Sequence, residues 1–227
     1  HSAEADTFLI YVRFGPGVDG IGSVLLERGM PGLTVGEVST FMNDDTWCAL
    51  YFDNVAIGKE HVLLGPGGFR KQMAGFNAER IGNTARSLAF GRYAYEAARE
   101  HAMTRKQFGR PLCEFQGLQW QFAEIKMRLE AAQLLLYRAA LSGENGIPTQ
   151  MDTAIAKHTC NQVGFDACNF AMQVMGGMGY SDESLIEYMF RKTRGWMIAG
   201  GSMEILKQRI AEGVFGRSFD QRPPKVG

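Results

Sequence analysis

The chain has 227 residues, of which 45% are hydrophobic and 21% are charged, and this globular composition excludes a disordered chain. Lysine plus arginine balances aspartate plus glutamate at 24 each, which excludes a general electrostatic attraction to nucleic acid or anionic lipid. No apolar run reaches the roughly 18 residues of a membrane-spanning helix, and the cysteines and histidines show no spacing typical of a metal site or disulfide framework.

Residues 7–53 are predicted to form an antiparallel β-region. Short runs rich in β-branched and aromatic residues are separated there by glycine, proline and asparagine. These runs are Phe8–Arg13, Ser23–Glu27 and Cys48–Phe52. After the turn that ends at Gly68 the hydrophobic period changes, so we place a domain boundary there. The expected domains are a partial β-domain at 1–68 and a helical domain at 69–227.

The second domain is predicted to be an up-and-down helical bundle. Its apolar residues recur at three- and four-residue spacing, the period of an amphipathic helix. The expected helices cover Ile81–Ala102, Phe115–Ala139, Met151–Met175 and a last segment from Ser202 onward. The third has almost no polar face, which indicates burial on most sides, and the acidic residues of 183–187 look like a solvated turn. The fold class is therefore α+β, a β-region followed by a C-terminal bundle.

Three segments carry a resemblance to a known family. They read Arg-Lys-Gln-Phe-Gly-Arg-Pro-Leu at 105–112, Phe-Gln at 115–116 and Gln-Val-Met-Gly-Gly-Met-Gly-Tyr at 173–180. In their residues and in their order along the chain they resemble the signature of the acyl-CoA dehydrogenases, and the resemblance covers nearly all of the chain. The resemblance assigns this chain to the C-terminal part of the family fold. We therefore expect the N-terminal half, which helps to hold the flavin, to be either lost from a fragment or supplied by another polypeptide.

The resemblance implies FAD as the cofactor. A guanidinium can bind the pyrophosphate oxygens through its planar fork, and adjacent glycines leave the main chain bare for a cofactor to approach. The cofactor-binding residues that it implies are Arg105, Phe108, Gln116, Gln173, Gly176, Gly177, Ser202 and Glu204. Most of these residues have a plainer alternative: a helix stop for the glycines, a surface residue for Arg105, a core aromatic for Phe108, a helix-surface amide for Gln116 and an N-cap for Ser202.

The catalytic base is expected on the first helix of the bundle. Oxidation of an acyl thioester needs a carboxylate facing the α-carbon. Many family members have a glutamate at the position of Gly200, where this chain has none. Enzymes resembling the isovaleryl-CoA and long-chain dehydrogenases have it instead before an arginine, and Glu79 followed by Arg80 fits that pattern. Glu79 is the predicted base and Arg80 a predicted substrate-binding residue, the plainer alternative being an exposed helix turn.

The environment of this site can also be predicted. A thioester α-proton is a weak acid, so the base gains from a desolvated pocket that raises its pKa. The enolate-like oxygen needs hydrogen bonds in the transition state. By the resemblance, one of these donors is the backbone N–H of Gly200, which glycine retains.

The function implied is FAD-dependent dehydrogenation of an acyl-CoA to the 2-enoyl-CoA, with an electron-transfer flavoprotein as electron acceptor. A second possibility is a different flavin reaction on the same scaffold, such as a desulfinase or monooxygenase, because Gly200 lacks the usual carboxylate. A third is a non-catalytic assembly subunit. The family forms dimers and tetramers in which cofactor contacts cross the interface, so we expect a homo-oligomer. The bacterial cytoplasm and the mitochondrial matrix both suit such an enzyme.

Overall fold

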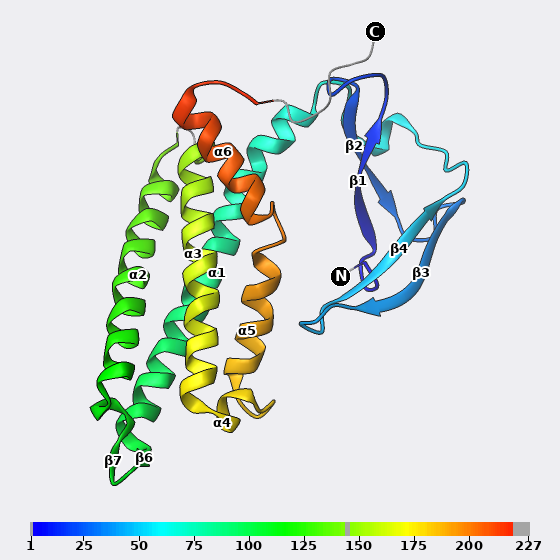
Figure 1. Cartoon of the computed structure of the whole chain (residues 1–227). Helices are drawn as coiled ribbons and strands as arrows, with labels where there is room; N and C mark the ends of the chain where they lie inside the picture. The colour runs from blue at the N-terminus through cyan, green and yellow to red at the C-terminus, as the bar shows by residue number, and fades with distance from the viewer. Residues whose placement is uncertain (1, 144–145, 220–227) are drawn as a thin grey trace. The chain divides into compact units, whose positions relative to one another are not determined.

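Small antiparallel sheets form the first part of the chain in the computed structural model, which describes residues 2–143 and 146–219 (Figure 1). Strands β1, β2 and β5 form one sheet in that order, and β3 pairs with β4 in a second. The strands are β1 (Thr7–Arg13), β2 (Ile21–Glu27), β3 (Leu33–Thr40), β4 (Thr46–Phe52) and β5 (Val62–Leu64), with a short 3-10 turn η1 (Lys59–His61) before β5. The predicted strand runs lie in β1, β2 and β4, whereas β3 and β5 were not predicted.

The core of this unit follows from the two-residue period of its strands. Phe8 pairs with Leu26 across β1 and β2, and both side chains are buried together with Val24 and Leu33. Strand β3 contains Gly36 and a shift of register against β4, so its apolar residues do not alternate regularly. That irregularity is why the sequence pattern did not identify it.

Six helices follow the sheets in the described residues. They are α1 (Phe69–Thr104), α2 (Gln116–Leu141), α3 (Gln150–Met175), α4 (Gly177–Tyr180), α5 (Leu185–Trp196) and α6 (Met203–Phe215). The chain divides into two compact units between Phe76 and Asn77, so the first turns of α1 belong to the first unit. The observed elements confirm the predicted α+β class. None of the helices within the described ranges is long and apolar enough to cross a membrane.

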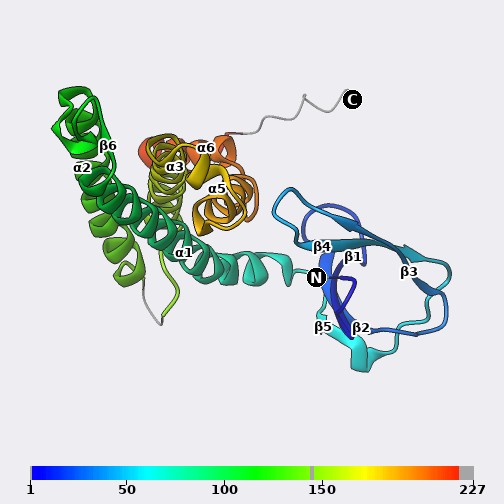
Figure 2. The same ribbon diagram turned by 90° about the horizontal axis from the view of Figure 1, so that it is seen from below.

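Helix α3 is the central helix of the bundle, packing against α2 and against α5 and α6, as Figure 2 shows from below. Leu88, Leu129 and Val163 are almost completely buried in the core that joins α1, α2 and α3. Helices α1 and α3 approach closely at Gly91 and Gly164. A Cβ on Gly91 would lie 2.8 Å from the Gly164 Cα, so glycine at this crossing permits backbone contact. The prediction that residues 151–175 are buried on most sides is confirmed.

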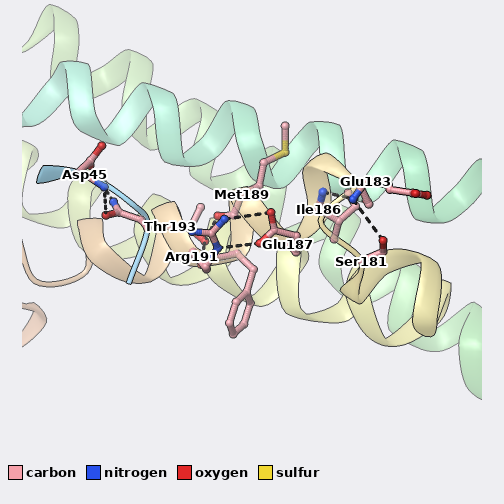
Figure 3. A network of polar contacts seen from close by, with 11 residues as sticks. Asp45, Ser181, Glu183, Ile186, Glu187, Met189, Arg191 and Thr193 are labelled. Carbon is pink, nitrogen blue, oxygen red and sulfur yellow. Dashed lines mark hydrogen bonds and ion pairs between the residues drawn. The ribbon is translucent and has the colours of Figure 1, made fainter. Parts of the chain in front are cut away.

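The predicted solvated turn at 183–187 is wrong in part, because α5 begins at Leu185. Ser184 is its N-cap, accepting a hydrogen bond from the Ile186 N–H at 3.1 Å. Within the helix, Arg191 donates from Nε and Nη2 to the two carboxylate oxygens of Glu187, at 2.7 and 3.1 Å (Figure 3). Both side chains of this i,i+4 pair are largely shielded from water, and the pair adds to the stability of the helix.

Candidate active site

The motif at 105–112 forms a tight hairpin of β6 (Lys106–Gln107) and β7 (Arg110–Pro111) at one end of the bundle (Figure 1). Its two turn residues, Phe108 and Gly109, have φ angles of +53° and +81°. Two positive φ angles characterise the two-residue turn that matches strand twist, and a bulky residue there is strained. The Phe108 side chain is 92% exposed. It is therefore not the core aromatic of the plainer alternative, but an apolar ring held out at a strained turn.

A cleft of about 570 Å³ lies beside this hairpin. It brings Arg105 next to Gly176 and Gly177, which follow α3 far along the sequence. The rest of its lining is His101, Gln107, Leu112, Val174, Met175 and Met178. Gly176 has φ +58° and ψ −135°, a conformation that glycine adopts without strain, and a Cβ on either glycine would meet open space. The cleft thus combines a cation with bare main chain.

This cleft fits the chemistry of FAD. Exposed main chain lets a flat or extended cofactor approach closely, and the exposed Arg105 guanidinium can reach phosphate oxygens. The exposed side chains of Gln116, the first residue of α2, and Gln173, in the last turn of α3, lie outside its lining. Their predicted contacts, like that of Phe108, depend on groups beyond this cleft.

A second region is built around the glycine turn that joins α5 to α6. Gly200 and Gly201 have φ angles of +70° and +107°, so both positions favour glycine. A Cβ on Gly200 would lie 3.5 Å from the Lys157 Cε and 4.0 Å from both Arg80 Cγ and Asn83 Nδ2. Arg80 Nε donates a 2.8 Å hydrogen bond to the Gly200 carbonyl. Within the described part of the chain, the Gly200 N–H has no main-chain acceptor.

The predicted base lies next to this turn. Glu79 precedes Arg80 on α1, and Asn83 Nδ2 donates to its Oε1 at 3.2 Å. The structure therefore brings Glu79, Arg80 and Gly200 into one neighbourhood, as the sequence analysis expects. Glu79 is exposed, however, so the described residues of the helical unit do not by themselves form the desolvated pocket predicted for it. It faces outward from a helix surface, where substrate and further protein would have to exclude water.

Lys157, on α3, is the residue of this site that sequence reasoning missed. Its side chain is completely buried, and its Nζ donates to the carbonyls of Trp196 at 3.0 Å and Gly201 at 3.3 Å. Burial, together with the charge of Arg80, lowers its pKa to about 8, while Glu79 acts in the opposite direction. The available signal was a lysine within a helix that otherwise has almost no polar face.

Arg80 lies beside Lys157 and is partly buried. Burial lowers the pKa of its guanidinium, with Glu79 raising it and Arg209 of α6 lowering it further. Its Nη1 donates to Asn77 Oδ1 at 3.2 Å, and the Asn77 amide in turn donates to the Pro148 carbonyl at 3.1 Å. The guanidinium is thus held in place between α1 and the glycine turn.

Ser202 is the N-cap of α6, as one of its two predicted roles requires. Its hydroxyl accepts a hydrogen bond from the Ile205 N–H at 3.5 Å. A backbone hydrogen bond and a hydrogen bond from Ser202 lower the pKa of Glu204, which lies in the first helical turn. Neither side chain lines the cleft beside Arg105. Among the described residues, no cluster of three or more His, Cys, Asp or Glu side chains could hold a metal ion.

The fold and these two regions define a class of protein: a helical bundle that carries a glycine-lined cationic cleft and, separately, a carboxylate beside a glycine turn. Residues 66–215 match the family model described as the acyl-CoA dehydrogenase C-terminal domain. The chain belongs to the acyl-CoA dehydrogenase family, and the predicted membership is confirmed.

Three similar proteins illustrate the range of the family. The 3-sulfinopropanoyl-CoA desulfinase of Variovorax paradoxus is 37% identical, over 94% of this chain and 56% of its own. The butyryl-CoA dehydrogenase structure from Megasphaera elsdenii is 32% identical with a TM-score of 0.85, over 94% of this chain and 57% of that one. The FAD complex of PigA is 27% identical with a TM-score of 0.81, and the match covers 94% of this chain and 57% of that one. The chain spans about half the length of the curated relatives it matches.

Proposed function

We propose that the protein containing this chain is an FAD-dependent acyl-CoA dehydrogenase with Glu79 as its base. The observation that carries the proposal is the juxtaposition of a carboxylate-bearing helix turn with the Gly200 turn, joined by the Arg80 hydrogen bond to the Gly200 carbonyl. A base and an uncommitted main-chain N–H are the two groups that α-proton removal from a thioester needs.

In this mechanism each residue has a separate task. Glu79 removes the α-proton, and the Gly200 N–H donates to the thioester oxygen as negative charge develops on it. Arg80, whose guanidinium is bonded to the Gly200 carbonyl, keeps that main chain in place. Its predicted contact with substrate stays a prediction. The acyl chain itself, on binding beside α1, would exclude water from the exposed Glu79 carboxylate and so strengthen it as a base.

The proposed cofactor is FAD, which when bound accepts the β-hydrogen as hydride at flavin N5. Arg105 would bind its phosphate oxygens, and the main chain at Gly176 and Gly177 would lie against it. The FAD complex of PigA, a protein of the same fold, supports this assignment. Phe108, Gln116, Gln173, Ser202 and Glu204 remain predicted contacts. Since most of them lie outside the cleft, we propose that they meet FAD in a homo-oligomer, with an electron-transfer flavoprotein as the electron acceptor.

A second candidate is desulfination of a sulfinated acyl-CoA. Two observations favour it: the relative from Variovorax paradoxus has this activity in its name, and Gly200 carries no carboxylate. A reaction that removes a sulfinate group from the acyl-CoA requires neither removal of an α-proton nor transfer of a hydride. Under this alternative Glu79 would be dispensable.

The deciding experiment mixes the complete FAD-loaded protein anaerobically with a panel of saturated acyl-CoAs and with 3-sulfinopropanoyl-CoA. We expect flavin absorbance to bleach with a saturated acyl-CoA, and the rate to fall about 10²- to 10⁴-fold in Glu79→Gln. Glu96→Gln, on the same helix and also exposed, is the matched control and should react like the native protein. Sulfite release without bleaching by any saturated acyl-CoA would replace the dehydrogenase assignment with the desulfinase one.

A further inference from the structure

Lys157 is unusual because it is a completely buried lysine whose two hydrogen bonds go to main-chain carbonyls. Burying an ammonium group costs free energy unless it is paired and hydrogen-bonded, and lysine is among the residues least often buried. The proposed reaction assigns it no role. Packing alone therefore does not explain why a lysine lies against the glycine turn.

The main chain from Trp196 to Gly201 is held by side chains from two helices. On α3, Lys157 binds the carbonyls of Trp196 and Gly201, and Asn161, one turn later, donates to the Trp196 carbonyl at 2.7 Å. From α1, Arg80 binds the Gly200 carbonyl. Carbonyls on both sides of the Gly200 N–H are thus fixed. A segment with two adjacent glycines at positive φ would otherwise have wide conformational freedom.

Two of these three donors, Lys157 and Arg80, are cations. A charge-assisted hydrogen bond to a carbonyl is stronger than a neutral one. The Gly200 N–H belongs to the peptide group of the Ala199 carbonyl, which is not among the carbonyls that these donors bind, so the cations act on that N–H through space, most strongly in a low-dielectric interior. The Lys157 Cε also lies only 3.5 Å from where a Gly200 Cβ would be. The positive charge of Lys157 is therefore close to the main chain that the proposed mechanism uses as a hydrogen-bond donor.

We propose that Lys157 is a positioning residue of the dehydrogenation: as a buried cation it fixes the 196–201 main chain and adds positive potential where the Gly200 N–H donates to the thioester enolate oxygen. This inference rests on the proposed function. It concerns a residue that touches neither substrate nor cofactor and acts through the main chain of its neighbours.

The test measures stabilisation of the enolate directly in the complete FAD-loaded protein. The probe is 3-thiabutyryl-CoA, in which sulfur replaces the β-carbon, so the α-proton is acidified and no β-hydrogen is available for transfer. Optical titration of the bound probe gives the pKa of its α-proton. We expect Lys157→Met to raise that pKa by about one unit, a tenfold loss of enolate stabilisation. Lys157→Arg, which keeps the charge, should restore much of the difference.

Thr153→Val is the matched control. Thr153 lies one turn earlier on α3, is also completely buried, and its hydroxyl makes no hydrogen bond within the described residues. It should leave the pKa of the bound probe unchanged. Hydrogen exchange of the 197–201 amides provides a readout independent of catalysis and should accelerate in Lys157→Met but not in Thr153→Val.

Failure of the proposed function and failure of the role of Lys157 would give different results. If native protein neither reacts with saturated acyl-CoAs nor deprotonates the bound probe, the proposed function fails and this inference fails with it. If native protein does both, but Lys157→Met shifts the probe's pKa no more than Thr153→Val does, only the role of Lys157 is overturned. Faster amide exchange without that shift would likewise mean a purely structural lysine. If Lys157→Met does not fold, the comparison is made with Lys157→Gln, which keeps donors but loses the charge and should show the same direction of change.

Discussion

The cleft beside Arg105 and the turn at Gly200 each contain glycine at positive φ, at Gly176 in the first and at Gly200 and Gly201 in the second, but they are supported in opposite ways. The cleft is open, and its arginine and glycines are exposed. The Gly200 turn is held from below by Lys157, Asn161 and Arg80. A site that binds a charged cofactor can rely on the cofactor to complete it, whereas a site that stabilises a transient charge must be preorganised. Substitutions in the cleft should therefore mainly weaken cofactor binding, whereas substitutions around the Gly200 turn should mainly slow the reaction.

The largest expected effect is that of Arg80→Met. Removing the guanidinium frees the Gly200 carbonyl and removes the hydrogen bond to Asn77 Oδ1. We expect kcat for a saturated acyl-CoA to fall about 10²-fold, comparable to loss of one oxyanion donor, while the protein still retains FAD. Stopped-flow flavin reduction measures the rate, and the flavin content of the purified protein measures the retention of FAD. Arg86→Met, an exposed arginine on the same helix, is the control. Equal loss of FAD and of rate would contradict the separation of the two regions.

Arg105→Met should show the reverse pattern. Loss of a phosphate-binding guanidinium is expected to weaken FAD binding about tenfold, with a smaller fall in the kcat of the FAD-saturated protein. Equilibrium titration of the apoprotein with FAD gives the affinity. Arg99→Met, an exposed arginine of α1 paired with Glu96, serves as the comparison. An unchanged FAD affinity would remove Arg105 from the cofactor site.

Gly176→Ala tests whether the cleft depends on backbone conformation rather than on space. A Cβ there meets nothing, so the expected cost of about 1–2 kcal/mol in unfolding free energy comes from the positive φ alone. Gly177→Ala, which also enters open space and lies in the first turn of α4 without a positive φ, should be close to neutral. Chemical denaturation of the two variants measures the difference. Equal stabilities would show that the strain at Gly176 is absent.

The smallest expected effect is a pH dependence of the unfolding free energy. It is measured as the difference between native protein and Lys157→Met. The pKa of Lys157 is lowered from 10.5 to about 8, so between these values the unfolded chain holds a proton that the folded one has released. Stability from this group must therefore rise with pH across that window. The charged groups acting on it are Glu79 and Arg80, with Arg209 acting on Arg80. A difference in unfolding free energy that stays flat from pH 8 to 10.5 would contradict the lowered pKa.

Much of the fold was predictable because its signals are local. The helical period located α2 and α3 to within a few residues, and Ser202 is the N-cap of α6, one of the two roles predicted for it. Helix α5 was not predicted, since the acidic residues at its start suggested a turn. In the structure Glu187 lies inside the helix and pairs with Arg191 one turn away. Strand β3 was missed because its register shift breaks the alternation.

The sequence by itself determined the family and the fold class, because the motif residues and the hydrophobic period are properties of contiguous residues. It also predicted Glu79 and Gly200 as members of one site. Only the tertiary structure decided that Phe108 is exposed, that Glu79 lacks a pocket of its own, and that Lys157 is buried beneath the glycine turn. Burial and hydrogen bonding depend on which segments, distant along the chain, pack together, and no local pattern records that.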